Sequence, residues 1–192
     1  MLILLSAGNR FATEMSTHLM TIGHSTLSAE EFLNLLEKNS VRCLADIRRF
    51  PGSRKFPHFN RDQLERSLPQ SDIEYHWLER LGGRRGRQKR TDSPNTGLRN
   101  ESFRNYADYM ATPEFKAGIS ELLELATTKP TAYMCSEAVY WRCHRRLVSD
   151  YLVANGFEVL HLMSTGQPRP HELTLGAVIK DGQVTYPADE SQ

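Results

Sequence analysis

The sequence predicts an α/β domain with a mainly parallel sheet and helices on both faces, a three-layer, Rossmann-like arrangement with a C-terminal β-hairpin. Short apolar runs of strand length alternate with amphipathic helical patterns through most of the chain. No internal repeat or interdomain linker interrupts this alternation. Near the C-terminus, an Asp181-Gly182 pair in the middle of residues 177–186 is typical of a hairpin turn.

The first half of the chain contains three expected strands and two expected helices. Residues 18–23 (HLMTIG) form the first strand. Ser28 then begins a helix as its N-cap, with Glu31 three residues later as the partner in a capping box. Phe32, Leu35 and Leu36 supply its apolar stripe. The remaining elements are a strand over 41–47, a helix over 60–68 with Asn60 as its cap, and a strand over 73–78.

The second half opens with a polar segment, residues 82–102, that is rich in Gly, Arg and Asn. It lacks hydrophobic periodicity, which predicts a long loop, and loops of this length in a compact domain are often functional. We expect helices over 103–110, 112–127 and 141–155, the last ended by Gly156, and strands over 131–135 and 157–163.

Composition narrows the class of protein. The chain has 192 residues, with 24 basic and 23 acidic side chains and a net charge of +1, so no global field attracts it to nucleic acid. Its 39% hydrophobic and 24% charged residues exclude a disordered, collagen-like or polytopic membrane protein. We expect a disordered extension over 1–16, one domain over 17–187 and a tail over 188–192.

Three cysteines and the absence of a signal segment predict a cytoplasmic protein that does not associate with membranes. An odd, low number of cysteines argues against a secreted disulfide framework.

Polar side chains follow four of the five predicted strands. The carboxyl ends of parallel strands share one edge of a sheet, and ligands of open α/β sheets collect there. The residues concerned are Gly23, His24 and Ser25 after the first strand, Asp46, Arg48, Arg49 and Ser53 after the second, Cys135, Ser136 and Glu137 after the fourth, Cys143, His144, Arg145 and Arg146 at the start of the next helix, and His161 and Ser164 at the end of the fifth.

The central candidate for catalysis is either Glu137 or the thiol of Cys135. Cys135 ends a strand near a helix N-terminus and several arginines, an environment that stabilises a thiolate. In this hypothesis His144 or His24 is the base, and Glu137 orients it or acts as a general acid. Residue type alone favours the alternative that Cys135 and Cys143 are buried structural residues. A metal site of Cys135, Cys143, His144 and His24, or a redox pair of the two cysteines, is a further alternative, although neither a zinc-finger nor a Cys-x-x-Cys spacing is present.

Arginines near the same edge predict an anion site. Arg48 and Arg145, with Ser53 nearby, suit phosphate or carboxylate because guanidinium groups bind these anions in a planar, bidentate way. The turn from Gly23 to Ser25 adds a backbone amide and a hydroxyl, helped by the dipole of the following helix. Asp46 orients an arginine or transfers a proton; the alternative is a structural salt bridge between Asp46 and Arg48.

Residues 84–90 form a basic run that suits nucleic acid. Five of these seven residues are basic, namely Arg84, Arg85, Arg87, Lys89 and Arg90, and such a run neutralises phosphates. Phe103, Tyr106 and Tyr109 follow. The alternative is a solvated loop followed by a helix whose tyrosines pack on the core.

Nine short motifs together resemble the DUF488 family of small bacterial and archaeal proteins. They are Thr21-Ile-Gly-His-Ser25, Asp46-Ile-Arg48, Pro51-Gly-Ser53, Phe59-Asn60, Leu81-Gly-Gly83, Ser93-Pro-Asn95, Tyr106-Ala-Asp-Tyr-Met110, Met134-Cys-Ser-Glu137 and Cys143-His-Arg145. They follow the family's order from residue 21 to residue 171, with Ser136 where the family typically has Ala. The resemblance implies an α/β domain with polar motifs at one edge, and it brings no assigned activity.

These observations predict an enzyme of unassigned reaction that acts on an anionic, phosphate-bearing substrate, either a nucleotide or nucleic acid. The sequence assigns no cofactor and no oligomeric state. A nucleic-acid-binding accessory protein using residues 84–90, and a metal-binding or thiol-redox protein, are the alternatives.

Overall fold

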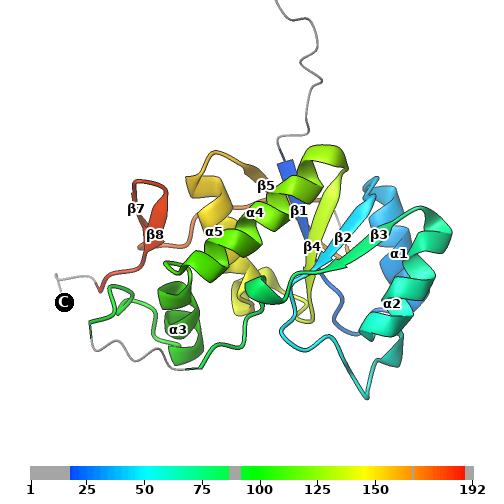
Figure 1. The fold of residues 1–192 in the computed structure, drawn as a ribbon, viewed down its shortest axis with the longest axis horizontal. Helices are drawn as coiled ribbons and strands as arrows, with labels where there is room; N and C mark the ends of the chain where they lie inside the picture. The colour runs from blue at the N-terminus through cyan, green and yellow to red at the C-terminus, as the bar shows by residue number, and fades with distance from the viewer. Residues whose placement is uncertain (1–17, 87–91, 166, 189–192) are drawn as a thin grey trace, which may run out of the picture.

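A six-stranded sheet forms the centre of the computed structural model, which describes residues 18–86, 92–165 and 167–188 (Figure 1). The strand order is β3-β2-β4-β1-β5-β6; β1 to β5 are parallel, and β6 pairs with β5 in the antiparallel sense. The bounds are β1 His18–Gly23, β2 Cys43–Asp46, β3 Glu74–Trp77, β4 Thr131–Cys135, β5 Glu158–Leu162 and β6 Arg169–Pro170. The mainly parallel sheet is confirmed, while the Rossmann-like classification stays a prediction.

Helices cover both faces of the sheet, as predicted (Figure 1). Along β4, Tyr133 and Cys135 point into the core beside α3, α4 and α5, whereas Ala132 and Met134 point into the core beside α1 and α2. The helices are α1 Ala29–Lys38, α2 Arg61–Ser67, α3 Glu101–Tyr109, α4 Pro113–Thr128 and α5 Arg145–Ala154, with short 3₁₀ helices at Pro57–Phe59, Leu68–Ser71, Glu79–Leu81 and Tyr140–Arg142.

Of the predicted caps at Ser28 and Asn60, the first is confirmed and the second is wrong. At α1, the Glu31 amide donates to Ser28 Oγ at 3.1 Å and the Ser28 amide donates to Glu31 Oε2 at 2.7 Å, which confirms the capping box. Asn60 also precedes its helix, but its side chain does not cap it. Asn60 Oδ1 instead accepts the amide of Ser53 at 2.6 Å and so holds the loop after β2.

The start of α5 differs from the prediction, which placed it at Trp141. Residues 140–142 form a 3₁₀ turn, and Cys143 is extended with φ −127° and ψ 149°, so α-helical hydrogen bonding begins only at Arg145. This break matters for the site because it turns Cys143 towards the end of β4.

The predicted C-terminal hairpin is confirmed as β7 Val178–Lys180 and β8 Gln183–Thr185. Asp181 and Gly182 have φ values of 50° and 71°, as a type I′ turn requires. The hairpin forms its own two-stranded sheet and packs against α5 (Figure 1).

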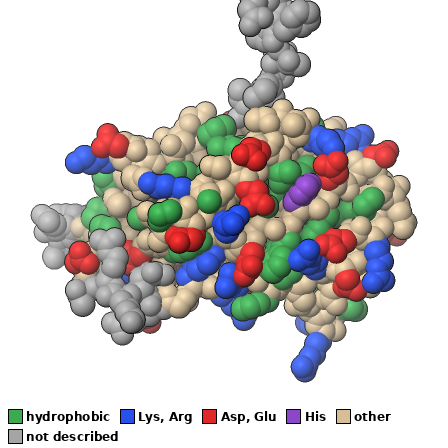
Figure 2. Space-filling model, in the orientation of Figure 1, with side chains coloured by type: hydrophobic (Ala, Val, Ile, Leu, Met, Phe, Trp, Pro, Cys, Tyr) green, Lys and Arg blue, Asp and Glu red, His purple; other side chains and the backbone are tan. Residues whose placement is uncertain are grey.

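Positive and negative side chains are interspersed over the face of the molecule seen in Figure 2, in keeping with the balanced charge. Among the described residues, no helix combines the length and apolar character needed to cross a bilayer. The predicted extension over 1–16 lies outside the described residues, as do 189–192 of the predicted tail. The single domain over 17–187 therefore stays a prediction.

Candidate functional site

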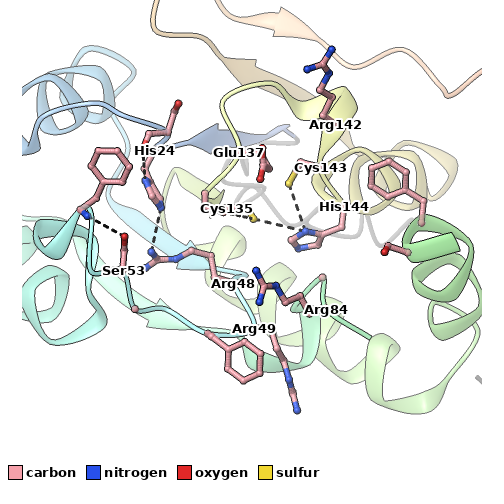
Figure 3. A pocket seen from close by; sticks show the side chains of 18 residues that line it. His24, Arg48, Arg49, Ser53, Arg84, Cys135, Glu137, Arg142, Cys143 and His144 are labelled. Carbon is pink, nitrogen blue, oxygen red and sulfur yellow. Dashed lines mark hydrogen bonds between the residues drawn. The ribbon is translucent and has the colours of Figure 1, made fainter. Parts of the chain in front are cut away.

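A cavity of about 550 Å³ lies beyond the carboxyl ends of β1, β2 and β4 (Figure 3). This volume is typical of small-molecule sites. Nine of the residues singled out from the sequence line it: His24, Ser25, Arg48, Ser53, Arg84, Cys135, Glu137, Cys143 and His144. The convergence of strand ends therefore brings these polar side chains together.

Two cysteines and a histidine meet at the floor of this cavity. Cys135 Sγ lies 3.8 Å and Cys143 Sγ 3.6 Å from the same atom, Nδ1 of His144 (Figure 3). All three residues are buried. Strand β4 supplies one thiol, and the segment immediately before α5 supplies the other thiol and the imidazole. Both cysteines are therefore buried and also face the cavity.

The two thiols differ in acidity. A hydrogen bond with Cys143, together with burial, raises the pKa of Cys135 to about 12. Burial alone would raise the pKa of Cys143, but hydrogen bonding from Cys135 and the charge and N–H groups of Arg145 lower it to about 6. Cys143 is thus the thiol that ionises first. Of the two thiols, the sequence hypothesis favoured Cys135, because sequence spacing does not show that Arg145 faces Cys143.

Asp46 and Arg48 form the salt bridge that was one of the two alternatives. Arg48 Nε lies 2.9 and 3.0 Å from the two Asp46 oxygens, and Nη2 donates to Asp46 Oδ2 at 2.5 Å and to the Phe59 carbonyl at 2.8 Å. Tyr75 donates its hydroxyl to Asp46 at 2.7 Å. Asp46 does not line the cavity, and its role is to hold Arg48 at the cavity wall.

His24 is a neutral imidazole in this arrangement. Its Nδ1 lies 3.1 Å from the Ser25 carbonyl, which only accepts, so Nδ1 carries the proton. Nε2 therefore accepts from Arg48 Nη1, 3.3 Å away. Burial, with the charge of Arg48 next in size, lowers the pKa of His24 to about 4. The ring also stacks on Phe59 with centroids 4.1 Å apart.

Of the other residues in the predicted anion site, Ser25 and Ser53 line the cavity, whereas Gly23 and Arg145 do not and position backbone instead. The amides of His24 and Ser25 donate to the carbonyls of Cys135 and Ser136, each at 3.0 Å. Arg145 is 1% exposed and donates from Nη1 to Thr21 Oγ1 at 3.2 Å and from Nη2 to the Glu137 carbonyl at 2.6 Å. Gly23 and Arg145 thus fix the segment that follows β4.

The basic residues of the run 84–90 do not share one environment. Arg84 is exposed and lines the cavity. Arg85 donates to the carbonyls of Gly82, Glu79 and Arg80, and its guanidinium lies 3.8 Å from the Tyr109 ring centroid. Arg87, Lys89 and Arg90 lie outside the described residues. Nucleic-acid binding through this run stays a prediction.

Sequence reasoning missed part of the cavity wall. Phe50, Phe56 and Arg142 line it, although none of them was assigned to the site. Arg49, noted at the end of the second strand, and Phe103, noted after the basic run, also line it. The stretch of basic residues from 142 to 146 is the one signal that pointed to Arg142. His161 and Ser164, which belong to the fifth strand and its end, do not line the cavity.

A family model with the description "Domain of unknown function DUF488" matches residues 28–152. The matched region contains Asp46, Arg48 and the whole Cys135–Arg145 segment, and β1 precedes it. A search of curated proteins found no match. A search of solved structures likewise found none. The family match covers well over half of the chain, and the chain therefore belongs to the DUF488 family.

Proposed function

We propose that this protein is an enzyme that binds an anionic, phosphate-bearing substrate in the cavity and acts on it with the groups at the cavity floor. The observation that carries this proposal is the pair Arg84 and Arg142 on the cavity wall. Both are exposed, and no carboxylate among the described residues lies within ion-pairing distance of either side chain. Unpaired arginine side chains on a cavity wall favour a phosphate or carboxylate ligand.

Aromatic side chains beside these arginines favour a nucleotide. Phe50, Phe56 and Phe103 line the same cavity, and Phe50 is 67% exposed. An exposed phenylalanine ring offers a face on which a base stacks, and stacking contributes about 1–3 kcal/mol per base. A substrate with both an aromatic base and a phosphate would contact the phenylalanine rings through its base and the arginines through its phosphate.

In this proposal the cavity residues have separate roles. Cys143, with Cys135 and His144, forms the reacting end, because these groups occupy the floor. Glu137 is exposed at the cavity and is the residue for proton transfer. Arg48 lies on the cavity wall, and its Nη1, which also donates to His24, stabilises the bound anion.

The test is binding and turnover over a panel of nucleotides and phosphate esters, measured by calorimetry and product analysis. We expect Arg142→Ala and Arg84→Ala each to weaken binding of an active compound about tenfold, since a charge-assisted hydrogen bond contributes about 1.5–3 kcal/mol. Cys143→Ala should abolish turnover while largely preserving binding.

Arg66→Ala is the matched control, because Arg66 is 72% exposed on α2 and pairs there with Asp62. It should bind and turn over like the wild type. The proposal is wrong if no compound binds, or if the cavity variants behave like Arg66→Ala on a compound that does.

A further inference from the structure

The floor of the cavity holds three metal-ligand atoms in one place. The sulfurs of Cys135 and Cys143 and Nδ1 of His144 all lie within 4.8 Å of one another. Cysteine sulfur and histidine nitrogen are the ligands that zinc prefers in proteins. The third free cysteine, Cys43, is buried in β2 and takes no part in this group.

The imidazole of His144 is oriented for metal binding. Nε2 lies 3.2 Å from the carbonyl of Ile47, and a carbonyl only accepts, so Nε2 carries the proton. In the neutral ring, the lone pair of Nδ1 then faces the two sulfurs. A metal-bound histidine typically donates its other N–H to a carbonyl or carboxylate, which fixes the tautomer and the ring.

Neighbouring residues hold this ring from two further directions. Tyr106 lies edge-on to it with centroids 5.1 Å apart. Gly83 packs so close that a Cβ at this position would lie 2.3 Å from Nδ1. The absence of a side chain at Gly83 therefore leaves the imidazole in its place.

The two sulfur–nitrogen separations are those of a tetrahedral site. With Zn–S near 2.3 Å and Zn–N near 2.1 Å, tetrahedral angles place a sulfur and a nitrogen about 3.6 Å apart. The observed separations are 3.6 and 3.8 Å. Two thiolates and a neutral imidazole also balance the charge of a divalent ion, so the buried site would carry no net charge.

We propose that Cys135, Cys143 and His144 bind one Zn²⁺ ion and leave its fourth coordination position open to the cavity. Three protein ligands with one open position characterise catalytic zinc sites, in which water or a substrate oxygen takes the fourth place. His24 is excluded as a fourth ligand, because Nδ1 donates to Ser25 and Nε2 accepts from Arg48. The zinc site holds whether or not the cavity ligand is a phosphate.

The test uses the full chain, kept reduced and stripped of metal with a chelator. Elemental analysis after reconstitution should give one zinc per chain. Cobalt should give the tetrahedral d–d bands and the thiolate-to-metal charge-transfer absorption of a two-thiolate site. Cys135→Ala, Cys143→Ala and His144→Ala should each weaken cobalt and zinc binding at least about tenfold.

Cys43→Ala is the matched control, since it removes the buried thiol that lies outside the group. It should bind both metals with wild-type affinity and spectrum. If Cys43→Ala weakens binding as much as Cys143→Ala does, the assignment of ligands is wrong.

The wild-type spectrum decides the question even if a ligand variant fails to fold. A folded, reduced wild-type chain that binds neither metal overturns the proposal. So does isolation of the native protein with a Cys135–Cys143 disulfide, detected as a mass two hydrogens lower. Zinc binding without any anion binding would instead contradict only the proposed function.

Discussion

The buried ion pair of Asp46 and Arg48 shows how a single residue holds part of the site. Asp46 is fully buried and accepts hydrogen bonds from Arg48 and Tyr75. Arg48 is 6% exposed and presents one edge to His24 and the cavity. Removing one member of a buried pair leaves the other charge without compensation, which costs far more than losing an exposed pair.

We therefore predict that Asp46→Asn lowers the free energy of unfolding by about 3 kcal/mol. The amide retains the shape of the carboxylate but leaves the Arg48 charge buried and unpaired. Urea unfolding of the variant and the wild type measures the difference. The control is Asp62→Asn, which removes the exposed pair with Arg66 at 3.6 Å and should cost no more than about 0.5 kcal/mol. Equal losses for the two variants would show that burial does not govern this pair.

The sequence predicted which kinds of side chain meet at this site, but it did not predict what each of them does there. The sequence indicated that Arg48 and Cys135 would meet at one edge, and both line the cavity. Arg145 was expected to bind the anion, yet it is buried and donates to Thr21 and the Glu137 carbonyl. A guanidinium has the same identity in either role, and only its three-dimensional neighbours decide between them.

Among the elements, the segment from β4 to α5 depends most on close backbone contact. The first turn after β1 packs directly on it, with the His24 amide donating to the Cys135 carbonyl. A Cβ at Gly23 would lie 1.8 Å from the Glu137 carbonyl oxygen and 2.6 Å from Arg145 Nη2. Since a backbone atom is one of the obstacles, the segment itself would have to shift.

We predict that Gly23→Ala destabilises the protein by about 1–3 kcal/mol, the usual cost of forcing extra volume into a packed interior. It should also increase proteolysis within residues 136–144, because the Arg145 contacts to that segment are displaced. Gly86→Ala is the control, since no atom of the described residues lies within 4 Å of a Cβ placed there. Chemical denaturation and limited proteolysis check both effects, and a Gly23→Ala variant as stable as Gly86→Ala would contradict the prediction.

The starts of α1 and α5 show which helix boundaries local sequence determines and which depend on tertiary structure. The capping box at α1 was found from Ser28 and Glu31 because both partners lie within one helical turn. The start of α5 was placed four residues too early, because the apolar pattern continues through the 3₁₀ turn of Tyr140–Arg142. Nothing in that pattern shows that Cys143 is extended.

At the scale of the whole molecule, a chain of buried polar groups joins α5, the end of the sheet and the C-terminal segment. Asp150 accepts from Tyr186 Oη at 2.7 Å and from His171 Nε2 at 2.9 Å. Because Nε2 of His171 donates to the carboxylate, its Nδ1 is the acceptor for His161 Nε2, 2.9 Å away. His161 is fully buried and stacks on Tyr140 at 3.4 Å.

This network predicts that acid destabilises the fold. Burial, together with the nearby His171 and Arg145, lowers the pKa of His161 from 6.5 to about 3. As the pH falls, His161 therefore becomes protonated near pH 6.5 in the unfolded chain but only near pH 3 in the folded chain. The contribution of His161 to stability is full above pH 6.5 and is lost as the pH falls through this window, by about 1–2 kcal/mol at pH 5.

Urea unfolding at several pH values between 5 and 7.5 measures this loss. His161→Gln should unfold more easily at neutral pH, and its free energy of unfolding should fall less steeply with acid than that of the wild type. Equal slopes for the variant and the wild type would show that His161 does not contribute to the acid sensitivity.

The sequence by itself determined the parallel sheet, the helices on both faces, the C-terminal hairpin and the edge at which Cys135, His144 and Arg48 meet. These features follow from hydrophobic periodicity, from caps and turns within a few residues, and from the common direction of parallel strands. Only the tertiary structure decided that Cys143 faces Cys135, that Arg145 is a buried clamp, and that His161, His171 and Asp150 form one chain. Those contacts join residues on different elements, so their geometry depends on how separate elements pack, which no local pattern encodes.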